Sequence, residues 1–231
     1  MRGKISFVLK ILVVLCSLGA FVIGLIFTDQ DSIASWSTRL LYFTWQSNIW
    51  LGVTFVLVII NSFTKGERKI VWKKRLYFLK YITTVCITIT FIVFNVFLLP
   101  FAPPEYKLLT LVSIMAHNLS PIFAVTDFFV DEFTIPFSKK KAFATTIPPL
   151  IYTFMVFILS TLHVDFGRGE EFPYYFMNMY SPAGFFGFSK IPPYFVGTFY
   201  WIVGLASIVV MIALLYAKLK IGVNNKIKRS K

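Results

Sequence analysis

Six apolar runs, each long enough to cross a bilayer as a helix, constrain the fold of this chain more than any other feature. A crossing takes about 20 apolar residues. With edges placed to within a few residues, the runs cover 5–27, 40–63, 78–101, 108–130, 142–162 and 195–217. Of all residues, 57% are hydrophobic and 14% are charged, whereas a soluble domain has about 25% charged residues. The sequence argues against a soluble globular fold and predicts an all-α integral membrane protein, a bundle of six transmembrane helices.

The first run follows Arg2 and Lys4, as the apolar part of a signal peptide would. It is too long for that role and lacks a small-residue cleavage site, so we expect a retained helix. No second domain, repeat of fixed period or low-complexity linker stands out in the chain. Residues 1–231 are therefore expected to form a single six-helix transmembrane domain.

The charges predict the orientation of the helices. Lysine and arginine number 23 and aspartate and glutamate 10, a net charge of +13. All but four of the basic residues fall within residues 1–10, 65–80 and 139–141 or after residue 217. Six crossings put these segments on one side, and the positive-inside rule makes that side cytoplasmic. We expect both termini in the cytoplasm, a plasma-membrane location and attraction of anionic lipids to the cytoplasmic face, worth about 1 kcal/mol per basic residue.

The second run opens with an unusually polar stretch, Phe43-Thr44-Trp45-Gln46-Ser47-Asn48. At 100° per residue, Thr44, Ser47 and Asn48 share one arc of the helix, which would face a neighbouring helix or a cavity. Polar groups within a membrane are candidates for function. The alternative is structural: the hydroxyls bond the preceding turn and the amide joins two helices.

The fourth run carries a stripe of polar and small residues that includes His117. A helix would place its members on one face: Thr110, Ser113, His117, Ser120, Ala124 and Asp127. His117 would lie about 14 Å from the start of the run, near the middle of the bilayer. Burial favours the neutral imidazole that a general base requires. The alternative is a histidine hydrogen-bonded only for packing.

Thr44 and His117 can act together only if they lie at the same depth in the membrane, and their positions along the expected helices differ. If the second helix begins at Leu40, Thr44 lies only about 6 Å into the membrane. A start near Trp36 would bring the two residues level.

Pro121 removes a backbone hydrogen bond one turn after His117, so we also expect a local distortion there.

The longest outer connection runs from His163 to Tyr194 and is rich in aromatic residues. A loop of this length and composition is unlikely to lie free in water, so we expect Pro173 to Phe176 to fold over the mouth of the bundle as a lid. His163, Tyr174 and Asn178 are the candidate supporting residues in this loop. The alternative is an aromatic belt at the headgroup level.

These features occur in a fixed order: Phe43-Thr44-Trp45-Gln46-Ser47-Asn48 in the second run, His117 four residues before Pro121 in the fourth, and His163 followed by Pro173-Tyr174-Tyr175-Phe176-Met177-Asn178. The set resembles the androgen-induced-protein-like membrane family and its bacterial six-helix relatives. The resemblance implies an intramembrane threonine hydrolase acting on a lipid ester, with Thr44 as nucleophile and His117 as its base. Asn178 departs from the family pattern, because acidic residues are common at its position.

The resulting hypothesis is that Thr44 attacks a lipid ester, His117 accepts its proton, and Ser47 and Asn48 orient the site or stabilise the oxyanion, with Ser113 and Tyr174 in support. Two readings compete: acyl transfer to an acceptor other than water, and a non-enzymatic channel, transporter or lipid-binding bundle. We expect the spans to lack paired charges, which argues against a transporter.

Several other partners are not expected. Cys16 and Cys86 lie inside apolar runs, which fits neither a disulfide framework nor a structural zinc site. We expect no cofactor and no metal. Nucleic acid is not an expected partner either, because binding it would need a folded soluble surface.

Overall fold

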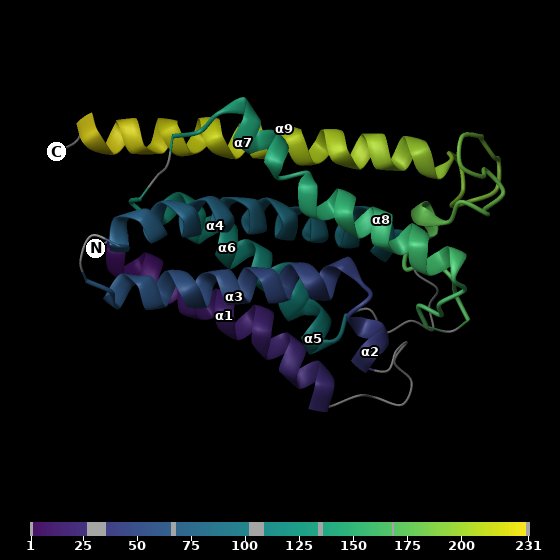
Figure 1. Cartoon of the computed structure of the whole chain (residues 1–231), viewed down its shortest axis with the longest axis horizontal. Coiled ribbons are helices and arrows are strands. Elements are labelled where there is room, and N and C mark those ends of the chain that lie inside the picture. The colour runs from purple at the N-terminus through teal and green to yellow at the C-terminus, as the bar shows by residue number, and fades with distance from the viewer. Residues whose placement is uncertain are drawn as a thin grey trace.

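The computed structural model describes residues 2–26, 36–65, 68–101, 109–133, 136–167 and 169–229. These residues form helices and connecting loops, with no β-strand among them (Figure 1). Six of the helical segments are long and apolar enough to cross a membrane: Arg2–Ile26, Phe43–Phe63, Ile70–Phe101, Leu111–Val130, Lys139–Thr161 and Thr198–Asn225. This confirms the all-α class and the six expected spans. Phe27, the last residue of the first expected run, and Leu108, the first residue of the fourth, lie outside the described residues.

Four helices form the centre of the bundle: α1 (Arg2–Ile26), α3 (Phe43–Phe63), α4 (Arg68–Ile92) and α6 (Ser120–Val130). Gly52 permits the close approach of α1 and α3, because a Cβ at this position would lie 2.5 Å from Cγ of Leu18. The long helix α9 (Thr198–Arg229) runs beside α4 and the short α7 (Lys139–Ala144). Both ends of the chain lie at the same end of the bundle (Figure 1).

Local sequence determines where the remaining helices begin. The short α2 (Trp36–Arg39) is separated from α3 by a turn, so the second span begins at Phe43 and not at Leu40 or Trp36. The helix α5 (Leu111–Ile114) begins after Thr110, whose hydroxyl accepts the N–H of Ser113 at 3.2 Å as an N-cap. In α8 (Ile147–Thr161) two prolines occupy the first turn, where a missing N–H costs no helical hydrogen bond.

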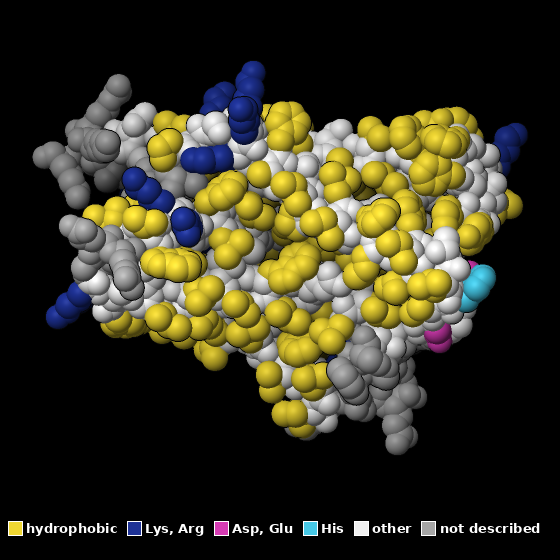
Figure 2. All heavy atoms as spheres, in the orientation of Figure 1, with side chains coloured by type: hydrophobic (Ala, Val, Ile, Leu, Met, Phe, Trp, Pro, Cys, Tyr) yellow, Lys and Arg dark blue, Asp and Glu magenta, His cyan; other side chains and the backbone are white. Residues whose placement is uncertain are grey.

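The outer surface of the bundle is largely apolar. Side chains such as Phe63, Ile151, Phe154 and Met211 are more than half exposed, and hydrophobic atoms cover much of the face in Figure 2. Lysine and arginine gather toward one end in that view, and acidic and histidine side chains show at the other. Apolar surface of this extent marks contact with lipid or protein. Together with the six apolar helices it indicates an integral membrane protein.

The expectation that the spans lack paired charges is wrong. Asp127 on α6 is fully buried and pairs with Lys10 of α1 at 3.1 Å and with Lys80 of α4. Asp131, just beyond α6, pairs with the same two lysines at 2.7 and 2.9 Å. Ser6 donates a further hydrogen bond to Asp127 at 2.5 Å. Charges placed in a low-dielectric interior require such partners. These ion pairs join three of the spans.

The last span is joined to the same cluster through the backbone. The ammonium of Lys220 on α9 donates to the carbonyl of Asp131 and lies 5.7 Å from the ring centroid of Phe128. Burial would raise the pKa of Asp131, but the nearby Lys80 and Lys10 ammonium groups outweigh it and hold that pKa well below its usual range. The contribution of Asp131 to stability is therefore complete above its unfolded-state pKa of about 3.9 and is lost as the pH falls below it.

We expect Asp127→Asn to destabilise the fold by about 3 kcal/mol, because it leaves the two buried lysines with Asp131 but without the fully buried carboxylate that pairs with both. Denaturant titration of the purified protein in detergent, followed by circular dichroism, measures this change. Glu132→Gln is the matched control, since Glu132 is an exposed carboxylate at the same end of the bundle. Equal stability of the two variants would contradict a stabilising role for the cluster.

Candidate functional site

The structure brings Thr44 and His117 together. Oγ1 of Thr44, in the first turn of α3, lies 3.2 Å from Nε2 of His117. The contact shows that the two residues lie level, although their distances from the starts of their helices differ. Thr44 is the second residue of α3, and His117 lies six residues, or about 9 Å, after Leu111. His117 is therefore about a third of the way along its span, Leu111–Val130.

The hydrogen-bond network assigns the tautomer of His117. Its Nδ1 lies 3.0 Å from the carbonyl oxygen of Ser113 and 3.1 Å from the hydroxyl oxygen of that residue. A carbonyl can only accept, so Nδ1 carries the proton and Nε2 has the free lone pair. Nε2 can then accept the proton of the Thr44 hydroxyl, as a general base must.

His117 lies in a π-helical turn, Met115–Leu119, that directly precedes α6 and Pro121. This is the local distortion expected from the proline. A second π-helical turn, Val93–Leu98, follows α4 and contains Phe94, whose ring stacks on the imidazole with centroids 3.8 Å apart. Such wide turns are rare and occur frequently at functional sites. The stack fixes the plane of the imidazole against Thr44.

Asn48 and Ser47 are engaged in holding helices together. The amide nitrogen of Asn48 donates to the carbonyls of Thr44 and Ala116 at 2.8 and 3.0 Å, and its oxygen accepts the Ser120 hydroxyl at 2.7 Å. The fully buried Ser47 hydroxyl contacts the carbonyl of Thr44 at 3.1 Å and the hydroxyl of Thr90 at 2.9 Å. Both amide hydrogens of Asn48 are used, so it supports the site without a donor to spare for a ligand.

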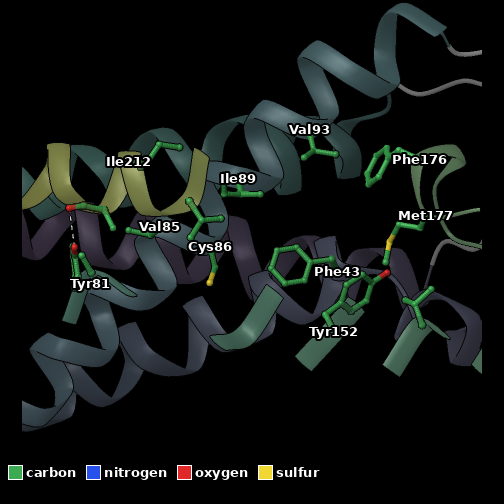
Figure 3. Packing of buried hydrophobic residues seen from close by; sticks show 14 of the residues in the cluster. Phe43, Tyr81, Val85, Cys86, Ile89, Val93, Tyr152, Phe176, Met177 and Ile212 are labelled. Atoms are coloured by element: carbon green, nitrogen blue, oxygen red, sulfur yellow. Dashed lines mark hydrogen bonds between the residues drawn. The ribbon is translucent and has the colours of Figure 1, made fainter. Parts of the chain in front are cut away.

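Thr44 faces a cavity of about 80 Å³ bounded by α3, α4, α8, α9 and the loop after α8. None of the lining residues carries a charge. Most of the wall is apolar and includes Ile89, Val93, Leu98, Leu150, Met177 and Leu205. In Figure 3 the labelled side chains Phe43, Val93, Tyr152, Phe176 and Met177 surround one common space. Apolar walls with few polar groups are typical of sites for small molecules and cofactors.

The loop after α8 packs over this cavity, as the sequence predicts for Pro173 to Phe176. A short 3₁₀ turn, Tyr175–Met177, buries Phe176 and Met177. The ring of Tyr174 stacks on that of Phe176 with centroids 5.2 Å apart, and its hydroxyl lies beside the side chain of Thr44. Tyr174 therefore belongs to the same site as Thr44.

The structure does not bring His163 or Asn178 to this site. His163 is exposed, and its Nδ1 lies 2.6 Å from a carboxylate oxygen of Glu171. The Asn178 side chain accepts the N–H of Tyr180 at 2.9 Å within a turn. Neither residue lines the cavity, so both contribute to the loop and not to the surroundings of Thr44.

Two residues of the site escape sequence reasoning. Phe94 is one of 27 phenylalanines, and nothing distinguishes it until its helix is seen to widen beside His117. Tyr152 of α8 reaches the cavity from an apolar run. A lone phenol in such a run could have been a signal, because a buried hydroxyl needs a partner.

The arrangement is suited to nucleophilic attack by a hydroxyl on an apolar molecule with an electrophilic carbon. The carbonyl of Ser113 orients the imidazole in the way that a carboxylate does in many triads.

Comparison of the chain with protein-family models, with curated proteins and with solved structures finds no match.

Proposed function

We propose that this protein is an intramembrane hydrolase that cleaves a lipid ester through Thr44. The Thr44 Oγ1–H bond breaks as the oxygen attacks the acyl carbon, and Nε2 of His117 receives the proton. The ester C–O bond then breaks, and His117 returns the proton to the leaving alkoxide. Water attacks the acyl-threonine in the second half, again with His117 as base, and Thr44 recovers its proton.

The observation that carries this proposal is the contact between Thr44 and His117. A hydroxyl is a weak nucleophile unless a base lies within about 2.6–3.2 Å, and the 3.2 Å separation meets that requirement. The proton on Nδ1 leaves the correct nitrogen free. The resemblance to the androgen-induced-protein-like family, carried by the positions of Thr44 and His117, supports the same two roles.

The cavity supports a neutral lipid ester as the substrate. Its uncharged wall offers no partner for a phosphate or a free carboxylate, whereas an acyl chain gains about 0.8 kcal/mol per buried CH₂. Substrate would enter from the membrane beside α8, which makes few close backbone approaches to the other helices.

The separation of the cavities favours this proposal over transport. A second cavity of about 330 Å³ lies at the other end of the bundle, where Lys10, Asn61 and Asp131 contribute to its wall. The two cavities share no lining residue. Fully buried Leu51, Phe55 and Ile87 lie between the two levels on α3 and α4, where a continuous transport path would need water.

The orientation follows from the charges. We propose that the end with both termini and most basic residues is cytoplasmic, in contact with anionic lipids there. The catalytic pair then lies near the outer leaflet, where water can reach the acyl-enzyme. The plasma membrane remains the proposed location.

Turnover by the purified protein tests the proposal. We expect wild type in detergent micelles to release 4-nitrophenol from 4-nitrophenyl palmitate much faster than from the acetate ester, with the activity absent from a matched preparation of Thr44→Ala. Saturable binding of the palmitate ester without turnover would support the lipid-binding alternative instead. Product formed only when an alcohol acceptor is added would identify an acyltransferase.

A further inference from the structure

Attack on an ester places negative charge on the carbonyl oxygen, and hydrolases stabilise that charge with preorganised donors. Sequence reasoning assigns this role to Ser47 or Asn48. Their hydrogen bonds to the carbonyls of Thr44 and Ala116 and to the Thr90 hydroxyl leave neither free for it. The donor for the developing oxyanion must therefore come from another part of the site.

The start of α3 provides donors beside the nucleophile. The first N–H groups of a helix lack carbonyl partners within it. Those of Trp45 and Gln46 bond the carbonyl of Tyr42 at 3.1 and 3.2 Å, whereas those of Phe43 and Thr44 have no carbonyl partner in the described part of the chain. The phenolic oxygen of Tyr174 lies next to both of these N–H groups and to the Thr44 side chain.

Tyr152 supplies an independent observation. Its side chain is 4% exposed, and its hydroxyl has no hydrogen-bond partner among the described residues. That hydroxyl lies close to the phenolic oxygen of Tyr174 and to the backbone of Phe43, without the geometry of a formed hydrogen bond. The two phenol rings lie 6.5 Å apart, and both line the cavity. A buried hydroxyl left without a partner is rare and needs an explanation such as a ligand that completes the network.

We propose that the Tyr174 hydroxyl is the donor that stabilises the oxyanion, polarised by the N–H groups of Phe43 and Thr44 and by the Tyr152 hydroxyl. The inference rests on the proposed hydrolase function. When substrate completes the network, the Tyr174 oxygen accepts from the start of α3 and from Tyr152, and its own proton points to the substrate oxygen. A phenol whose oxygen accepts a hydrogen bond becomes a stronger donor through its own O–H group. Tyr174 is thus a catalytic residue, and Tyr152 a positioning residue.

Tyr174 keeps its proton under working conditions. Burial raises the pKa of this phenol by more than its polar neighbours at the start of α3 lower it. A neutral phenol is the form that donates to an oxyanion. The loop also holds the ring in place, because Tyr174 packs edge-on against Tyr42 at 5.9 Å and the Tyr42 hydroxyl donates to the carbonyl of Phe166 at 2.8 Å.

Steady-state kinetics with 4-nitrophenyl palmitate tests the inference. We expect Tyr174→Phe to lower kcat by about 100-fold with little change in KM, as loss of one oxyanion donor does elsewhere. Tyr152→Phe should lower kcat by a smaller factor. Tyr175→Phe, the matched control from the same loop, does not line the cavity and should keep wild-type kcat.

Replacement of Tyr174 with 3-fluorotyrosine separates chemistry from packing, because it keeps the shape and the donor. This variant should retain wild-type kcat. Loss of activity equal to that of Tyr174→Phe, or wild-type kcat in Tyr174→Phe, would overturn the role of Tyr174 while Thr44-dependent hydrolysis still stood. Absence of hydrolysis by wild type would overturn the hydrolase function itself and this inference with it.

Discussion

Thr44→Ala is expected to lower kcat for 4-nitrophenyl palmitate by about 1,000-fold or more, because it removes the atom that forms the acyl-enzyme. Thr44→Ser should retain part of the activity, since the serine hydroxyl can occupy the same position 3.2 Å from Nε2 of His117. Release of 4-nitrophenol by the purified variants, at equal protein and detergent, measures the difference.

Thr153→Ala is the matched control for this substitution. Thr153 lines the same cavity, but its hydroxyl donates to the carbonyl of Pro149 at 2.9 Å and lacks a base. We expect Thr153→Ala to keep kcat within a few-fold of wild type. A Thr44→Ala protein as active as the Thr153→Ala protein would rule out Thr44 as the nucleophile.

His117→Gln is the second substitution with a large expected effect. Glutamine keeps much of the bulk against Phe94 but cannot act as a base, and general-base catalysis contributes about 10²–10⁴-fold. We expect kcat to fall by that factor with a smaller change in KM. Ester turnover and the melting temperature should be measured together, so that lost activity is separated from lost folding.

Ser113→Ala provides the contrast for the histidine. The carbonyl of Ser113 lies 3.0 Å from Nδ1 of His117 and is retained in the variant, so the tautomer of the imidazole is preserved. We expect kcat to fall by less than about tenfold, the loss of a hydroxyl worth roughly 1 kcal/mol. A loss as large as that of His117→Gln would mean that the hydroxyl, and not the carbonyl, orients the base.

The six spans could be predicted because length and apolarity determine them without reference to tertiary structure. The residues at which the helices begin could not be predicted from length and apolarity. The start of α5 depends on the side-chain cap that Thr110 provides, and the turn between α2 and α3 moves the second start to Phe43. These few residues matter for the site, because they place Thr44 in the first turn of α3.

Polarity alone marks Thr44 and His117 as candidates in apolar spans, and the family resemblance supplies their pairing as proposed nucleophile and base. The roles of the neighbouring residues could not be predicted from the sequence. Asn48 shares a helix face with Thr44, but the carbonyl of Ala116 that occupies it comes from another helix. Phe94 reaches the imidazole only through two π-helical turns, and a helical periodicity of 3.6 residues does not predict such insertions.

The ion-pair cluster was missed for a related reason. Counting basic residues treats Lys10, Lys80 and Lys220 as topology signals at the ends of spans. The structure buries all three and places them around Asp127 and Asp131. Pairing between residues on different helices depends on how the helices pack, which periodicity within one run does not indicate.

Detection of an acyl group on Thr44 is the most direct test of the proposed mechanism. Wild-type protein should be mixed with 4-nitrophenyl palmitate, quenched in acid during turnover, digested and analysed by mass spectrometry. We predict that the peptide containing Thr44 gains the mass of one palmitoyl group, and that the Thr44→Ala protein gains none. Turnover accompanied by a palmitoyl group on another residue, or an equal adduct in Thr44→Ala, would contradict the mechanism.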